Sequence, residues 1–372
     1  MLYLFNSAFR PKYSKNVMNT LYLPEGCSNE YRYRSGGDHP NVSASFMSNR
    51  NKIATNTECV IVFIDRFASS GYCYHPLRIA NLISFRDEAG YLFAKVALKK
   101  YIYPRNLQKL QTDLLSALSQ AGLPRLTGDD PENPSDGHYI LEAESIFGQA
   151  SLFFERDEAW EAAVGDLEKT RALSANENQW PVFMKSEVRS REDQKTLLPV
   201  ADGAVRRFEF TRDKTYELAV AYRFPKQMDD RQAQFKMQLH LGDVLRPLSA
   251  TDFAIDSIMN RDVKPFGTRK YAEDMSGSIA LGIDEPPQGI DVIYPDVAIE
   301  FTLTEGTRFW LAVAASLLIY CLAGALLAAD FSKLNPFSWK SLASLVWPRM
   351  IIAFFQALAL VLLFRKIGKK VL

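Results

Sequence analysis

Cysteine is scarce in this 372-residue chain, and no two cysteines are spaced as a CxxC pair. The sequence therefore indicates neither a zinc site built from paired cysteines nor a disulfide framework, and we expect reduced, buried thiols. The few histidines are widely separated along the chain. No metal and no cofactor is predicted. The residues in question are Cys27, Cys59, Cys73, Cys321, His39, His75, His138 and His240.

The motifs of common enzymes are missing as well. The chain has no GxxxxGK[ST] loop, no GxGxxG, no HExxH, no GxSxG and no EF-hand pattern. A catalytic set could assemble from Cys73, His75 and a distant carboxylate, because residues two apart on a strand share one face. An ordinary pair on a strand edge is the commoner meaning of that spacing. Enzymatic activity is therefore not predicted, and a membrane-tethered hydrolase or nuclease stays an alternative.

Charge of one sign is also lacking, since 44 Lys and Arg oppose 43 Asp and Glu. This balance excludes a uniformly basic nucleic-acid-binding protein. It conceals an asymmetry along the chain. Residues 1–110 carry 15 basic and 7 acidic side chains, whereas residues 111–169 carry 3 basic and 13 acidic ones. The basic segment either pairs with the acidic one or meets an anionic ligand.

Long apolar runs are confined to the C-terminal part. Residues 309–329 carry no charge and would span about 31 Å as a helix, enough to cross a bilayer core. A shorter run over 350–364 precedes four cations between Arg365 and Lys370. We expect a two-helix transmembrane hairpin over 307–372 with a basic cytoplasmic tail, which requires the lipid bilayer as a partner.

The same pattern predicts the location of the protein. Two spans return the chain to its starting side, and the first residues lack the apolar core of a secretory signal. The expected location is the inner (cytoplasmic) membrane, multi-pass, with both termini cytoplasmic.

Small and polar residues inside the two apolar runs favour close helix packing. Small residues four apart let helices approach, and a polar side chain at membrane depth can bond across an interface. Packing within one hairpin and homo-oligomerisation both fit. The residues are Gly324, Ala328, Ala353, Gln356 and Ala357.

The remaining chain indicates an α+β, membrane-anchored protein with a β-rich N-terminal domain over 1–169. Cys59–Asp65 and Tyr91–Ala97 have the composition of strands, and leucines at helical spacing predict a helix over 106–121. A second helix is expected over 157–169. These elements favour a sheet or partial barrel with packed helices.

The following segments are expected to differ in character. Residues 170–205 show no period and contain a charged stretch, which favours a linker. Alternating strands return over 206–306 and predict a β-sandwich-like juxtamembrane domain.

Basic and aromatic residues interleave near the N-terminus and form the candidate ligand site. Such a mixture suits a phosphate-bearing ligand, a nucleotide or nucleic acid, whose base needs a stacking platform. In the alternative interpretation the tyrosines are core residues and the cations pair with the acidic segment. The candidates are Arg10, Lys12, Tyr13, Lys15, Tyr31, Arg32, Tyr33, Arg34 and Arg78.

In its organisation the chain resembles membrane effectors of bacterial anti-phage defence systems, in which a cytosolic sensing domain is fused to a few spans. The resemblance implies a membrane-anchored sensor or effector whose spans assemble in the membrane. Together with the basic and aromatic N-terminal residues, it predicts a soluble region that binds a phosphate-bearing ligand or a protein partner and controls assembly of the hairpins. It would be a homo-oligomer or a subunit of a membrane complex. A structural or scaffolding subunit of a larger membrane complex is the alternative.

Overall fold

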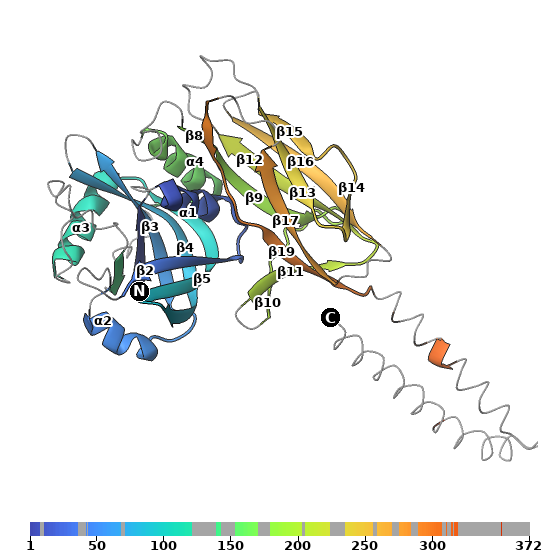
Figure 1. Ribbon diagram of the computed structural model, residues 1–372, viewed down its shortest axis with the longest axis horizontal. Helices are drawn as coiled ribbons and strands as arrows, with labels where there is room; N and C mark the ends of the chain where they lie inside the picture. The colour runs from blue at the N-terminus through green and yellow to red at the C-terminus, as the bar shows by residue number, and fades with distance from the viewer. Residues whose placement is uncertain are drawn as a thin grey trace, which may run out of the picture. The chain divides into compact units, whose positions relative to one another are not determined.

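The fold was analysed in a computed structural model of the chain (Figure 1). It describes most of the N-terminal three hundred residues and a few positions beyond them. The described residues are 1–7, 11–35, 42, 44–67, 71–120, 139–142, 153–169, 179–202, 205–223, 235–255, 259–269, 275–283, 289–306, 310, 314, 316–318 and 351.

The protein has a β-rich α+β fold, and its N-terminal part is a strongly curved half-barrel sheet (Figure 1). The strand order is β2-β5-β4-β3-β1-β6, with β7 added at the end of β5. β1 and β3 are parallel, and the other neighbours are antiparallel. The strands are β1 Leu2–Ser7, β2 Ser28–Arg34, β3 Glu58–Phe67, β4 Gly71–Glu88, β5 Tyr91–Pro104, β6 Tyr139–Glu142 and β7 Phe153–Glu155.

The long hairpin of β4 and β5 gives this sheet its curvature. Its tight connection is Ala89–Gly90, where both residues have positive φ angles of 49° and 78°. Register shifts interrupt β4 near Arg78 and near Leu82. Bulges of this kind bend a strand and increase its twist, which explains the partial closure of the sheet.

Helices of the N-terminal part pack on the half-barrel. Leu110 and Leu114 of the third helix are buried in a cluster with Tyr3 and Phe5, as their helical spacing predicts. The helices are α1 Pro11–Tyr22, α2 Ala44–Asn49, a 3-10 turn Arg50–Lys52, α3 Leu107–Gln120 and α4 Arg156–Leu167.

The following region forms two sheets, mainly antiparallel. One has the order β10-β11-β19-β17-β13-β15 and the other β14-β16-β12-β9, while β18 and β8 form a small parallel pair. Its strands are β8 Gln179–Pro181, β9 Phe183–Ser190, β10 Val200–Asp202, β11 Val205–Thr211, β12 Thr215–Arg223, β13 Phe235–Leu241, β14 Leu245–Pro247, β15 Asp252–Ile255, β16 Met259–Thr268, β17 Ser276–Ile283, β18 Asp291–Ile293 and β19 Ile299–Thr304.

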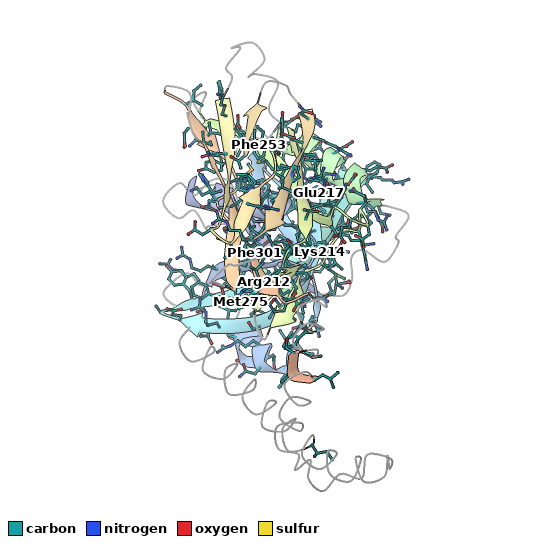
Figure 2. All side chains as sticks on the ribbon, turned by 90° about the vertical axis from the view of Figure 1, so that its right-hand side faces the viewer. Arg212, Lys214, Glu217, Phe253, Met275 and Phe301 are labelled. Atoms are coloured by element: carbon teal, nitrogen blue, oxygen red, sulfur yellow. The ribbon has the colours of Figure 1, made fainter. Side chains whose placement is uncertain are left out.

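Aromatic side chains join the two larger sheets. Phe210 of β11 packs on Tyr216 and Phe266 from the other sheet, at centroid distances of 4.5 and 5.5 Å. Phe253 and Phe301 are buried in the same core (Figure 2). Arg212, which follows β11, donates a hydrogen bond to the Met275 sulfur at 2.9 Å. These aromatic contacts pack the two larger sheets against each other.

The half-barrel and the paired sheets share one hydrophobic core. Tyr31 and Leu82 from the first belong to the same buried cluster as Met184 and Phe301 from the second. Met1–Leu303 therefore form one compact unit, and Thr304–Leu372 form another. The expected division of the N-terminal unit into two independent domains is not what the contacts show.

The linker prediction is wrong for residues 179–202. β9 pairs with β12 along its whole length, and Phe183, Met184 and Val188 are buried. Charged residues such as Glu187 and Arg189 made this segment look like a linker in the sequence, and they lie on the outer face of β9. Residues 170–178 and 203–204 lie outside the described residues.

The C-terminal unit is sparsely described. The expected spans 309–329 and 350–364 lie outside the described residues except at 310, 314, 316–318 and 351. Within the part that the structure describes, no helix combines the length and the apolar character needed to cross a membrane. The expected packing residues lie outside it as well: Gly324, Ala328, Ala353, Gln356 and Ala357.

Candidate ligand-binding face

The predicted site residues near the N-terminus separate into different environments. Arg10 lies outside the described residues, and Lys12 and Tyr13 lie on α1 with side chains outside that part. Lys15 is exposed and forms an ion pair with Asp296 at 3.1 Å. Lys15 is therefore neutralised by the protein itself.

β2 separates aromatic from charged side chains, as its alternation predicts. Tyr31 and Tyr33 are completely buried, and Tyr31 shares a 2.7 Å hydrogen bond with Thr20. Burial raises the pKa of Tyr31 to about 12. The tyrosines are core residues, so the prediction that they stack on a ligand is wrong. Arg32 and Arg34 occupy the opposite face of the strand.

Arg78 is a structural residue and not a ligand-binding one. Only 1% of it is exposed. Its guanidinium donates to the carbonyl oxygens of Lys99 at 2.8 Å, Thr20 at 3.1 Å and Leu23 at 2.5 Å. It also lies over the Tyr101 ring at 4.3 Å. Arg78 thus ties α1 and the turn after it to β4 and β5, which corrects its prediction as a site residue.

Arg32 and Arg34 belong to a regular array on the outer face of β2, β5 and β4. β5 lies between the other two, and its half-buried outer positions alternate with buried ones. Phe93 is flanked by Arg32 and Arg86. We call this array the Arg–aromatic face, and it comprises Glu30, Arg32, Arg34, Ser84, Arg86, Glu88, Tyr91, Phe93 and Lys95.

The neighbouring positions of the array follow the same register. Tyr91 lies between Arg34 and Glu88, and Lys95 lies between Glu30 and Ser84. Four cationic and two anionic side chains therefore surround two rings. The face is positive and is partly apolar at its centre.

Two guanidinium groups stack on these rings. Arg32 lies over Tyr91 with a distance of 4.7 Å from its central carbon to the ring centroid, and Arg86 lies over Phe93 at 4.3 Å. Arg86 also contacts Glu30 at 3.2 Å and pairs with Glu88. Each guanidinium thus lies over a ring, where its other side can meet a further planar group.

Sequence analysis missed the central residues of this face. Tyr91 and Phe93 lie in a segment whose residues are nearly all apolar, and nothing in it distinguishes the outer from the inner positions. The signal that could have identified them is the alternation of outer and buried residues along the second strand of the hairpin. Tyr91, Phe93 and Lys95 alternate with the buried Leu92, Ala94 and Val96.

A buried polar chain connects β4, β5 and α4. Tyr103 donates to Asp166 at 2.8 Å, and His75 Nδ1 lies 2.9 Å from the Tyr103 oxygen. Because Tyr103 has one proton and gives it to Asp166, His75 donates through Nδ1–H. Its Nε2 is then an unprotonated nitrogen without a hydrogen-bond partner in the apolar core.

This arrangement sets the ionisation of all three groups. Burial lowers the pKa of His75 to about 4, although Asp166 opposes the shift. Burial and the adjacent Asp166 raise the pKa of Tyr103 far above its ordinary value. Burial would raise the pKa of Asp166, but hydrogen bonds from Lys169 and Tyr103 outweigh this and lower it. In this hydrogen-bonded series His75 is therefore neutral and Asp166 is anionic.

The same burial removes the predicted catalytic alternative at Cys73 and His75. Both residues are at least 94% buried, so no substrate reaches them. Cys27 and Cys59 are buried as well, and burial raises the pKa of each thiol to about 12. Among the residues that the structure describes, no group of three His, Cys, Asp or Glu could hold a metal ion.

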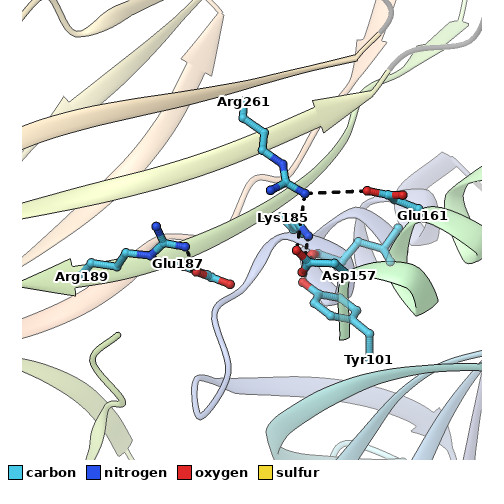
Figure 3. Close-up of polar contacts among 8 residues, drawn as sticks. Tyr101, Asp157, Glu161, Lys185, Glu187, Arg189 and Arg261 are labelled. Atoms are coloured by element: carbon cyan, nitrogen blue, oxygen red, sulfur yellow. Dashed lines mark hydrogen bonds and ion pairs between the residues drawn. The ribbon is translucent and has the colours of Figure 1, made fainter. Parts of the chain in front are cut away.

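A second charged cluster lines a shallow groove on the outer face of β9, β12 and β16, with a volume of about 110 Å³ (Figure 3). Ala219 and Ala221 form its floor, and α4 closes one end with Asp157. Lys185, whose side chain is 9% exposed, donates to Asp157 at 2.6 Å. Arg261 reaches the same carboxylate at 3.4 Å.

Each cation of this groove already faces a carboxylate. Arg261 approaches Glu161 at 3.7 Å as well, and Arg189 pairs with Glu187 at 2.5 Å. The hydrogen bond from Lys185 lowers the pKa of Asp157 and keeps it ionised. The cluster connects α4 to the paired sheets and is electrostatically satisfied, so it is the weaker candidate for an anion site.

Comparisons with known proteins give no further assignment. No protein-family model matches the chain, and no curated protein matches it. The function must be argued from the residues themselves.

Proposed function

We propose that residues 1–303 form a recognition module that binds a phosphate-bearing ligand with a planar base on the Arg–aromatic face. The observation that carries the proposal is the pair of stacks, Arg32 on Tyr91 and Arg86 on Phe93, side by side on one sheet surface. Planar bases stack on aromatic rings and on guanidinium groups, and phosphates bind the edges of the same guanidinium groups.

The electrostatics of the face support an anionic ligand. Arg34 and Lys95 carry further positive charge beside the two stacks. Charged hydrogen bonds contribute about 1.5–3 kcal/mol each when they are shielded from water. Glu30 and Glu88 both form ion pairs with Arg86, and no carboxylate among the described residues forms one with Arg34 or Lys95.

The C-terminal runs supply the second half of the proposal. Residues 309–329 and 350–364 have the composition of a membrane hairpin, and only 304–308 separate Leu303 from the first run. Ligand binding would control how these hairpins associate, in a homo-oligomer or as a subunit of a membrane complex at the inner membrane. This is the behaviour of the anti-phage membrane effectors that the chain resembles in organisation.

The experiment uses the full chain in detergent and two fluorescent probes, an ATP analogue and a 12-nucleotide oligothymidylate. We expect at least one probe to bind, and Arg32→Ala with Arg86→Ala to weaken binding more than tenfold. The matched control is Arg189→Ala with Arg261→Ala, which removes two arginines from the charged groove. Equal loss in both double variants, or no binding of either probe, would refute the proposal.

A scaffolding subunit is the second candidate, and one observation favours it. Leu198, just before β10, and Val200, its first residue, expose 58% and 49% of their surface. Exposed apolar side chains of this kind are typical of protein contacts. Replacing both with serine would abolish co-purification of a partner in that case and would leave probe binding unchanged.

A further inference from the structure

We infer that the ligand of the Arg–aromatic face is a single strand of nucleic acid, several nucleotides long, and not an isolated nucleotide. The inference rests on the proposed function and specifies its ligand class. It depends on the number of stacking positions and on their order across the three strands.

The first observation is the spacing of the two stacks. Tyr91 and Phe93 are two residues apart on β5 and point to the same side. Residues i and i+2 of a strand are about 6.5–7 Å apart. Each ring carries its own guanidinium, Arg32 on Tyr91 and Arg86 on Phe93. The face therefore offers two neighbouring positions for bases, whereas one nucleotide would occupy only one.

The second observation is the distribution of charge around the rings. Arg34 lies across from Tyr91 at one end of the array, and Lys95 lies two residues beyond Phe93 at the other end. A strand that stacks successive bases on the two ring–guanidinium pairs would place its phosphates near these two cations. A ligand with one phosphate group could contact only one end.

The third observation is the shape of the surface. Its rings lie on the open outer side of a sheet, and the side chains of Arg34 and Arg86 are exposed. Unpaired bases can be laid flat on such a platform, but the bases of a duplex are stacked on one another and are not available. The face thus favours single strands over duplexes, and stacking makes it tolerant of sequence.

The experiment measures binding of four probes to the full chain in detergent: thymidine monophosphate, dT4, dT12 and a 12-base-pair duplex. We expect dT12 to bind at least tenfold more tightly than the mononucleotide and the duplex. Because Arg34 and Lys95 would neutralise about two phosphates, log K should fall against log salt with a slope of about −1.4.

Two variants separate stacking from charge. Phe93→Leu should weaken dT12 binding at least fivefold, and Arg32→Lys with Arg86→Lys should weaken it although every charge is kept. Arg189→Ala with Arg261→Ala is the control and should bind normally. The binding result for Phe93→Leu counts only if this variant has the same unfolding temperature as the wild type. If it does not, the variant Arg32→Lys with Arg86→Lys provides the test.

The outcomes distinguish this inference from the proposed function. If the mononucleotide binds as tightly as dT12 and depends on Arg32 and Arg86, the inference fails and the proposed function stands. If duplex binds as well as dT12, or the lysine variant binds normally, the contact is unspecific charge and the inference fails. If no probe binds, both fail.

Discussion

The guanidinium of Arg86 lies 4.3 Å from the centre of the Phe93 ring and forms ion pairs with Glu30 of β2 and with Glu88 of its own strand, β4. An exposed arginine normally samples many rotamers and loses that freedom on binding, at a cost of up to about 2 kcal/mol. The contacts with Phe93, Glu30 and Glu88 restrict Arg86 before a ligand binds and so reduce this cost. Glu30 and Glu88 are therefore positioning residues of the proposed site, although their charge is the same as that of the ligand.

The two faces of β2 predict opposite effects on stability. Tyr31→Ala should lower the free energy of unfolding by about 3–5 kcal/mol, because it empties a buried site and leaves Thr20 without its tyrosine partner. Arg32→Ala should change it by less than about 1 kcal/mol. Urea unfolding of the full chain in detergent checks both. A large loss in Arg32→Ala would show that this arginine is a structural residue.

Arg78 is expected to be indispensable for the N-terminal fold. Arg78→Met leaves the carbonyl groups of Thr20, Leu23 and Lys99 buried without a donor, so we expect a loss of about 3 kcal/mol or more. Arg78→Lys should recover only part of it, because an ammonium group cannot reproduce the planar fork. Thermal unfolding should show the wild type to be the most stable, Arg78→Lys intermediate and Arg78→Met the least stable. A fully stable Arg78→Met would contradict the assignment.

Acid sensitivity should originate in part from His75. Its pKa is about 4 in the folded chain and near 6.5 when unfolded, so the unfolded state takes up the proton first as the pH falls. Stability from this group is complete above pH 6.5 and is lost progressively towards pH 4, by about 2 kcal/mol at pH 5.

The test compares wild type with His75→Gln by urea unfolding at pH 7 and pH 5. The wild type should lose about 2 kcal/mol more than the variant between the two values. Equal losses would show that His75 titrates normally and that its hydrogen bond with Tyr103 is not as described.

Much of the fold follows from local patterns, and the errors have physical causes. The helix at Leu110 and Leu114 and the alternation of β2 depend on neighbouring residues and were predictable. β9 was missed because its outer face carries Lys185, Glu187 and Arg189, which together have the composition of a solvent-exposed segment. Glu187 and Arg189 compensate each other, but Lys185 pairs with Asp157 of α4, a partner that only the tertiary structure supplies.

The proposed site could be predicted only in part, because tertiary structure brings some of its residues together. Arg32 and Arg34 were identified from their own strand. Tyr91 and Phe93 join them through strand pairing, which no local period reveals. Arg78 was misassigned because burial of an arginine depends on backbone carbonyls that the fold brings together.

The membrane topology is a separate prediction. If both termini are cytoplasmic, a membrane-impermeant thiol reagent outside intact cells should label a cysteine placed at Ser338, between the apolar runs, and miss one at Ser7 or Gly368. Each is introduced in a chain whose native cysteines are replaced with serine or alanine. Labelling at Ser7 and Gly368 with protection at Ser338 would reverse the proposed orientation.

The most direct measurement of the central claim is ultraviolet cross-linking of the full chain to dT12, followed by mass spectrometry of the cross-linked peptides. The Arg–aromatic face predicts that the major adducts fall within 91–95, with minor ones within 30–34 and 84–88. It also predicts that Arg32→Ala with Arg86→Ala removes them while Arg189→Ala with Arg261→Ala does not. Adducts concentrated on α1 or on the groove of β9, β12 and β16, with residues 91–95 unmodified, would contradict the account.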